Sequence, residues 1–138
     1  PLYRETYRVV VSATHPLSQR ESVNLHVLVG NEALARVDCE MHEVLFSFCA
    51  DRGNTMSFTH RSNRVDWILE LVRLGRGFVI LPETAVPRSK EFTSLTIEDA
   101  NFERHVVALR YLYQTARSEM RGFTQELARH KPVDEYFM

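Results

Sequence analysis

The segment from Val65 to Glu83 constrains the fold of this 138-residue chain more than any other. Apolar residues recur on two helical faces from Val65 to Leu74, so we expect a helix that is mostly buried. Gly75 suits the left-handed conformation that ends a helix, and Gly77 allows a sharp turn into Phe78–Leu81. An apolar run of four residues bounded by glycine and proline predicts a strand that is covered on both faces.

The residues before this segment predict two strands and two helices. Tyr7–Ser12 is rich in β-branched residues and indicates a strand, and Leu34–Asp38 is a candidate second strand. Apolar residues spaced i, i+3, i+4, i+7 and i+8 from Met41 to Cys49 predict a helix that ends near Gly53. Val23–Leu28 favours a short helix. Each helix follows a strand, as in an α/β domain.

The residues around and after position 55 predict the remaining elements. We expect a short strand over Thr55–Thr59, and a side-chain cap from Ser62 or Asn63 on the helix that follows. Pro82–Thr93 has the composition of a surface loop. Further expected elements are a strand over Ser94–Ile97, a strand over His105–Leu112, and a helix capped by Thr115, with Ala116, Met120, Phe123 and Leu127 on one face. Strands alternating with helices predict the α/β class, with a mostly parallel sheet flanked by helices.

The charge balance argues against a chain that binds DNA through its own surface. Lys and Arg number 17 and Asp and Glu number 18, whereas binding to a phosphate backbone needs a basic excess. The longest apolar runs, such as Phe78–Leu81 and Val106–Leu109, are far shorter than the ~20 residues of a membrane-spanning helix. The N-terminus shows no basic segment leading into an apolar signal core, so we expect a cytoplasmic protein with no membrane partner.

Cysteine and histidine spacing gives little support to a catalytic or metal site. Two cysteines, Cys39 and Cys49, are too few for the disulfide framework of a small secreted domain. The six histidines form no His-x-x-x-His pair, and no glycine-rich nucleotide loop is present. His15 precedes Pro16 without a partnering nucleophile, which favours a turn residue over a catalytic base. We therefore expect no enzyme activity, no cofactor and no metal.

Two junctions are the natural places for a ligand. In parallel α/β sheets, ligands bind beyond the carboxyl ends of the strands, where helix N-termini present free amides. Asp38–Glu40 connects a predicted strand to a predicted helix, and His60–Asn63 is the next such junction.

Several motifs, taken in order, resemble the effector-binding domain of the LysR-type transcriptional regulators of bacteria. Val72-x-x-Gly75-x-Gly77, followed by a buried strand closed by Pro82, is similar to the helix–glycine–strand unit of that family. The strand into His15-Pro16-Leu17 resembles the family's crossing strand and turn, and 105–129 resembles its closing strand and helix. Arg36-x-x-Cys39-Glu40 resembles a subgroup that carries an Arg and a Cys-Glu pair there.

The resemblance implies a periplasmic binding protein-like II fold, in which two α/β subdomains are joined by crossing strands and an effector binds between them. Residues 14–93 would form the second regulatory subdomain, with 1–13 and 94–138 as crossing strands and returning C-terminal segment. The chain opens at Pro1 without an initiator Met, so we expect a fragment. It would lack most of the first subdomain and the DNA-binding winged helix-turn-helix.

The implied function is sensing of a small anionic effector by a homodimeric or homotetrameric regulator, which contacts DNA only through its N-terminal domain. Arg61, Ser62 and Asn63 would bind an effector carboxylate. Alternatively, Ser62 or Asn63 only caps a helix and Arg61 is solvated. The candidate effector-binding residues are Arg61, Ser62, Asn63, His60, Arg36, Cys39 and Glu40.

Three other readings stay open. One is a solute receptor of the periplasmic type, and another is a small α/β enzyme. The third is a redox-sensing regulator that uses Cys39 and Cys49, since one subgroup of the family senses oxidants through a cysteine pair. Ten residues of helix separate two side chains by roughly 15 Å of rise, far more than a disulfide spans. Redox pairing would therefore require unwinding.

Overall fold

The computed structural model describes residues 2–109 and 118–129. Contacts divide the chain into two compact units, one formed by Thr6–Glu103 and the other by residues 1–5 and 104–138. The division into subdomains at residues 14–93 stays a prediction. With η marking a short 3₁₀ helix, the elements are β1 (Tyr3–Ser12), η1 (Pro16–Gln19), β2 (Ser22–Val23), α1 (Leu25–Leu28), β3 (Ala33–Arg36), α2 (Met41–Ala50), β4 (Phe58–Ser62), α3 (Val65–Arg73), β5 (Phe78–Pro82), η2 (Glu83–Ala85), β6 (Phe92–Ile97), β7 (Glu103–Val106) and α4 (Ser118–Arg129).

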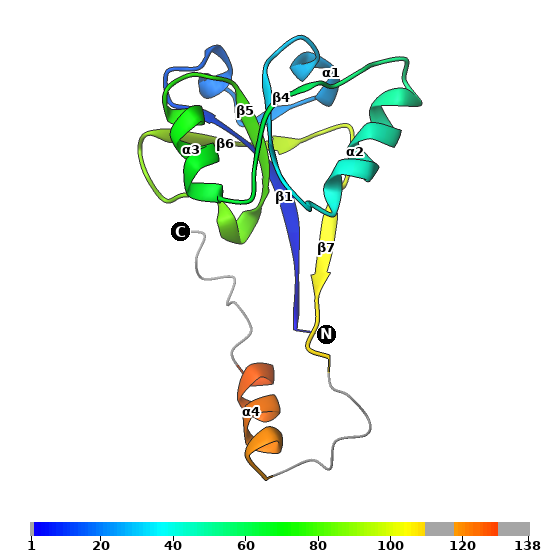
Figure 1. Ribbon diagram of the computed structural model, residues 1–138, viewed down its shortest axis with the longest axis vertical. Helices are drawn as coiled ribbons and strands as arrows, with labels where there is room; N and C mark the ends of the chain where they lie inside the picture. Colours follow the sequence, from blue (N-terminus) through cyan, green and yellow to red (C-terminus); the bar gives the residue numbers. More distant parts are fainter. Residues whose placement is uncertain (1, 110–117, 130–138) are drawn as a thin grey trace. The chain divides into compact units, whose positions relative to one another are not determined.

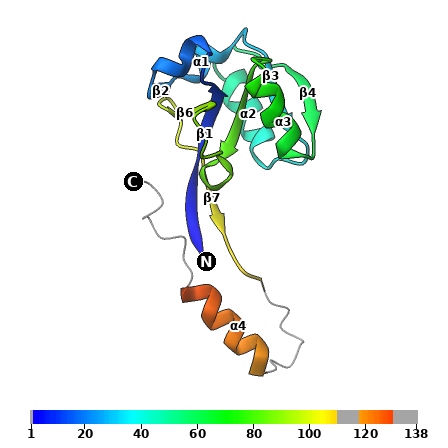
Figure 2. The ribbon, with the colours of Figure 1, turned by 90° about the vertical axis from the view of Figure 1, so that its left-hand side faces the viewer.

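A mixed sheet forms the framework of the larger unit. Its strands lie in the order β2-β6-β1-β5-β3-β4, and Figure 2 shows β2 and β4 at opposite edges. The pairings of β2 with β6, of β3 with β5 and of β3 with β4 are parallel, as expected for an α/β fold. Strand β1 lies between β5 and β6 and runs antiparallel to both.

Alternating side chains of β1 divide the core into two layers. Val9 and Val11 pack on one face of the sheet in a cluster with the buried residues of α2. Val10 packs on the other face, in a cluster with Ile68 and Val72 of α3. Helices α2 and α3 therefore cover opposite faces of the sheet, as Figure 1 shows. This arrangement follows from the two-residue period of a strand.

The predictions for α2 and β5 are confirmed. Helix α2 begins at Met41, and its buried residues Met41, Leu45 and Cys49 lie on the face that the apolar spacing predicts. Every residue of Phe78–Pro82 in β5 is buried, as expected for a strand covered on both faces. Gly77 leads into this strand with φ +125°, next to the Glu32 carbonyl that accepts the Phe78 amide at 3.0 Å.

The expectation that the helix after Val65 is mostly buried is wrong. Ile68 and Val72 of α3 are buried, but Trp67 is 63% exposed and Leu74, just after the helix, is 59% exposed. The helix packs on the sheet along one stripe, and of the second apolar face only Leu71 is partly buried against the core. The sequence pattern alone did not distinguish two buried faces from one.

The strand expected over Thr55–Thr59 lies three residues further along the chain. Strand β4 comprises Phe58–Ser62 and pairs in parallel with β3. It is an edge strand of mostly polar residues, so it carries no apolar alternation that would have marked its bounds. The junction residues His60, Arg61 and Ser62 are therefore strand residues.

The predicted cap of α3 by Ser62 or Asn63 is not formed. Arg64 is the residue before the helix, and no side chain caps it. Ser62 Oγ instead accepts a hydrogen bond from the Arg64 amide at 3.0 Å, which stabilises the turn between β4 and α3. Asp66 lies in the first turn, as expected, and its carboxylate pairs with the Arg64 guanidinium at 2.5 Å.

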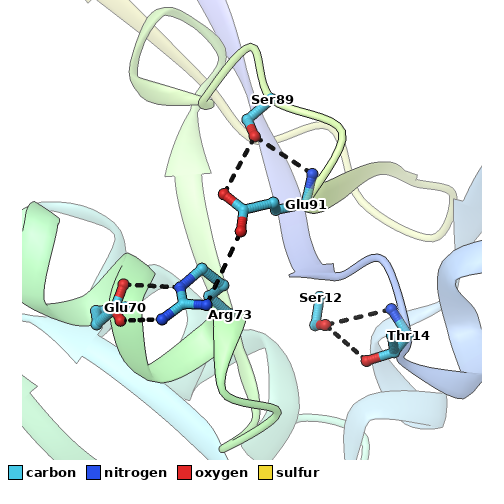
Figure 3. A network of polar contacts seen from close by, with 6 residues as sticks. All are labelled: Ser12, Thr14, Glu70, Arg73, Ser89 and Glu91. Atoms are coloured by element: carbon cyan, nitrogen blue, oxygen red, sulfur yellow. Dashed lines mark hydrogen bonds and ion pairs between the residues drawn. The ribbon is translucent and has the colours of Figure 1, made fainter.

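The predicted loop 82–93 contains η2 and the first two residues of β6. Figure 3 shows how this loop is attached to α3. Arg73 binds the Glu70 carboxylate one turn earlier and reaches Glu91 of the loop at 3.9 Å. Ser89 Oγ lies 3.5 Å from the Glu91 carboxylate and accepts the Glu91 amide at 3.3 Å.

The last predicted strand is shorter than expected where it can be compared. Strand β7 covers Glu103–Val106, not 105–112, and residues 110–112 lie outside the described residues. Thr115 and Ala116, the expected cap and first apolar residue of the last helix, also lie outside them. In the smaller unit, the Leu2 amide donates to the Val106 carbonyl at 2.7 Å, and Arg104 Nε donates to Glu5 at 2.6 Å.

Candidate functional site

An open depression lies at the carboxyl ends of two neighbouring parallel strands, β3 and β4. The pairing continues one residue past β3, because the Val37 amide donates to the Ser62 carbonyl at 2.9 Å. The segment between β3 and α2, the first turn of α2 and one residue of β4 form its walls. The lining residues are Val37, Asp38, Cys39, Glu40, His42, Glu43 and Arg61. This is the position at which α/β sheets bind ligands.

Asp38 shapes the connection between β3 and α2. Its φ is +56°, the left-handed region that residues other than glycine rarely occupy, although aspartate tolerates it better than most. The unusual conformation turns the chain from the end of β3 into α2 within four residues. Asp38, Cys39 and Glu40 consequently lie together along one wall of the depression.

The Glu40 carboxylate is bound on two sides. The buried Tyr7 phenol of β1 donates a hydrogen bond to Glu40 Oε1 at 2.5 Å. Arg36 Nη2 donates to Glu40 Oε2 at 3.1 Å, an ion pair between the end of β3 and the start of α2. The Glu40 side chain keeps 47% of its surface exposed, so it is both anchored and in contact with solvent.

The ring of Phe58 contacts the side chains of both Arg61 and His42. The Arg61 guanidinium lies over the Phe58 ring at 5.7 Å from its centroid, within the range of a cation–π contact. The His42 ring packs against the same Phe58 ring at 4.9 Å. Phe58 thereby holds Arg61 of β4 and His42 of α2 on the same side of the depression.

The electrostatics of this group lower the pKa of His42. Burial disfavours the charged imidazolium and lowers its pKa most, and the positive charges of Arg61 and Arg36 lower it further. His42 is therefore neutral near pH 7, with an ordinary pKa of about 6.5 as reference. A bound anion would offset the two guanidinium charges and favour proton uptake at this ring.

A family model matches nearly the whole length of the chain. Residues 1–132 match the family model of the LysR substrate binding domain. It is a member of this family. The matched relatives include a hydrogen peroxide-inducible genes activator of Pectobacterium carotovorum subsp. carotovorum, 27% identical over 92 residues. That match covers 66% of this chain but 30% of the relative, so the chain spans less than a third of that regulator.

Solved structures of an effector-binding domain and of a regulatory domain share the fold. The effector binding domain of QuiR in complex with shikimate has a TM-score of 0.72 at 16% identity, covering 100% of this chain and 66% of that chain. The CcmR regulatory domain of Synechocystis PCC6803 in complex with 2-PG has a TM-score of 0.77 at 13% identity, covering 97% and 66%. The α/β fold and the family resemblance that the sequence predicted are confirmed.

Within this LysR domain, the structure brings some of the predicted site residues together. Arg61, Cys39 and Glu40 line the depression, and Arg36 contacts it through Glu40. Ser62 and Asn63 are not among its described lining residues. His60 is not among them either, and its Nδ1 lies 3.2 Å from the Thr59 hydroxyl.

Sequence reasoning missed His42, Glu43 and Tyr7. His42 and Glu43 sit in the first turn of the predicted helix, directly after the Asp38–Glu40 junction, so their position along the chain was an available signal. Tyr7 is 33 residues away from Glu40 in the sequence, and no local pattern connects the two. Only the tertiary fold brings the β1 phenol to the start of α2.

The two cysteines of this LysR domain are both free. Cys39 is half-buried at the depression, and Cys49 is buried near the end of α2. Burial raises the pKa of the Cys49 thiol, with Asp99 raising it further, so this thiol is a poor nucleophile near neutral pH. The described part of the chain shows no cluster of His, Cys, Asp and Glu able to hold a metal ion. Within residues 2–109 and 118–129, no helix has the length and apolar character needed to cross a membrane.

Proposed function

We propose that this chain is the ligand-sensing part of a LysR-type regulator and binds a small carboxylate effector in the depression at the ends of β3 and β4. The observation that carries the proposal is the position of Arg61, which lines a depression at the place where α/β sheets bind ligands. A guanidinium can bind a carboxylate through two parallel hydrogen bonds. The neutral His42 ring and Cys39 supply further polar contacts along the wall.

The matched structures support a small organic acid as the ligand class. QuiR is described in complex with shikimate, a small carboxylic acid, and CcmR in complex with 2-PG. Binding makes and breaks no bond, so the proposed module is not an enzyme. The neighbours of Arg61 along the chain are His60 and Ser62 on β4 and Asn63 in the turn after it. We place these three residues at the rim of the site.

Regulation requires parts beyond this chain. Effector binding changes the geometry around the depression, and the change passes through a homodimer or homotetramer to a separate DNA-binding domain. A sequence upstream of Pro1 with the pattern of a recognition helix would support this account. An apolar signal core there would instead favour the solute receptor.

A thermal-shift screen of small carboxylates tests the proposed site. Saturating ligand should raise the melting temperature of the chain, since a ligand that binds only the folded state stabilises it. Arg61→Ala should abolish the shift, whereas Arg76→Ala, at an exposed position after α3, should leave it intact. If no carboxylate shifts the melting temperature, or if both variants respond like the original chain, the site is wrong.

Redox sensing is a second candidate, because the matched relative is a hydrogen peroxide-inducible activator and Cys39 lines the depression. An intramolecular Cys39–Cys49 disulfide would require α2 to unwind, since the rise of the helix separates Met41 from Cys49 by roughly 12 Å and Cys39 precedes the helix. Treatment with hydrogen peroxide, followed by mass spectrometry under non-reducing conditions, tests it. Formation of the disulfide, with loss of the product in Cys39→Ser, would favour redox sensing over carboxylate binding.

A further inference from the structure

The two arginines near the depression differ in what they face. Arg61 lines it directly, whereas Arg36 is not among the described residues that do. Arg36 is bound by Glu40, which does line the depression and keeps about half of its side-chain surface exposed. The Glu40 carboxylate therefore takes the contact with Arg36 that a carboxylate of a ligand would otherwise make.

The charges around the depression are unfavourable for a ligand with two negative groups. Among the described lining residues, Asp38, Glu40 and Glu43 carry carboxylates and Arg61 carries a guanidinium. One ligand carboxylate can pair with Arg61. A second would meet a wall of like charge, and like charges at short range repel.

We propose that Glu40 is the specificity-determining residue of this site: by occupying Arg36 and presenting its own negative charge, it restricts the effector to monocarboxylates and excludes dicarboxylates. This inference rests on the proposed function of the depression and adds the charge class of its ligand. In this proposal, Arg36 forms an ion pair with Glu40, and Arg61 binds the carboxylate of the effector.

Tyr7 makes Glu40 a fixed element of the wall. The phenol is 2% exposed in β1 and donates to Glu40 Oε1 at 2.5 Å, while Oε2 faces Arg36. A carboxylate held at both oxygens loses little further freedom when a ligand arrives and is costly to displace. Glutamine at position 40 can keep the Tyr7 contact through its amide oxygen, but it removes the charge and releases Arg36.

The test compares two ligands that differ by one carboxylate, benzoate and phthalate, by calorimetric titration of the 138-residue chain. In the original chain, benzoate should bind more tightly than phthalate. Glu40→Gln should strengthen benzoate binding about threefold and phthalate binding about tenfold. The reason is that each carboxylate of the ligand gains a solvent-exposed ion pair, which contributes a fraction of a kcal/mol. The ratio of the two affinities is the readout that a purely structural role would not change.

Two further variants test whether the effect of Glu40→Gln on ligand affinity comes from freeing Arg36 or only from removing a negative charge. Glu43→Gln removes one carboxylate from the same wall and should change the affinity ratio less than Glu40→Gln. Adding Arg36→Ala to Glu40→Gln should cancel most of the gain for phthalate. Equal effects of Glu40→Gln and Glu43→Gln, or a gain that survives Arg36→Ala, overturn the role of Arg36.

The outcomes also distinguish this inference from the proposed function. If Arg61→Ala abolishes benzoate binding but Glu40→Gln leaves the affinity ratio unchanged, the site stands and the specificity role of Glu40 is wrong. If neither ligand binds the original chain or any variant, the carboxylate site itself is contradicted, and the inference with it. Tighter binding of phthalate than of benzoate by the original chain also overturns the inference.

Discussion

The buried phenol of Tyr7 in β1 donates a 2.5 Å hydrogen bond to the carboxylate of Glu40, the residue before α2. The contact joins the first strand of the chain to the wall of the depression, across 33 residues of sequence. A displacement of Glu40 by a ligand would therefore act directly on this strand.

Tyr7→Phe should lower the free energy of unfolding by about 1–2 kcal/mol, because it removes a hydrogen bond to a charged acceptor and leaves the ring in place. Tyr3→Phe, the same change at the first residue of β1, should cost less than about 0.5 kcal/mol. Denaturant unfolding of both variants measures the difference. Equal losses would mean that the Tyr7–Glu40 contact contributes nothing specific.

Gly77→Ala should destabilise the fold by about 3 kcal/mol or more, because an added Cβ would lie 2.0 Å from the Glu32 carbonyl oxygen at a φ of +125°. Gly75→Ala is the matched control, since its φ is +73° but nothing lies within 4 Å of the added atom. It should cost about 1 kcal/mol through backbone strain alone. Similar melting temperatures for the two variants would contradict the close approach at Gly77.

His42 should make stability depend on pH below about 6.5. Burial first, and then Arg61 and Arg36, lower its pKa in the folded chain. The unfolded chain therefore binds more protons as pH falls through that value, and the folded state loses stability. His42→Gln should flatten this part of the pH profile, while the half-buried His15, whose pKa is also lowered by burial, affects both proteins alike.

An NMR titration of the His42 ring gives the direct check. Its midpoint should lie below that of an ordinary histidine, and Arg61→Ala should move it upward by removing the second cause of the shift. A midpoint at or above about 6.5 in the original chain would refute the description of this group.

The two faces of α3 should respond very differently to substitution. Ile68→Ala should cost about 2–4 kcal/mol, because the side chain is 1% exposed in the core cluster against β1 and β5. Trp67→Ser should cost less than about 1 kcal/mol, since the ring is 63% exposed and its described contact is with the Arg64 guanidinium. Chemical denaturation would show the contrast, and a costly Trp67 variant would mean that the outer face is covered.

Parts of the fold were predictable because they carry strong periodicity. The apolar spacing of α2 and the apolar run of β5 identify their elements from local sequence alone. Strand β4 was misplaced, since an edge strand with one apolar residue and four polar ones has no such pattern. The exposure of Trp67 was also unpredictable, because apolar composition does not say which of two helical faces meets the sheet.

The candidate site was predictable in part for a different reason. The junction rule pointed to Asp38–Glu40 and to His60–Asn63, and the parallel pairing of β3 and β4 does bring Arg61 beside Cys39 and Glu40. The rule could not separate Arg61 from His60 or Ser62, because register and side-chain direction on β4 decide which residue faces the depression. The Tyr7 contact needed the complete fold.

The most direct test of the account is a titration of the isotope-labelled chain with benzoate, followed by amide NMR shifts. We predict saturable changes that are largest in Val37–Glu43 and at Arg61, and that disappear in Arg61→Ala. Saturable changes confined to other parts of the chain, such as α3, would contradict the site. The absence of any saturable change with benzoate or with the other carboxylates of the thermal-shift screen would contradict the proposal that this depression binds a carboxylate effector.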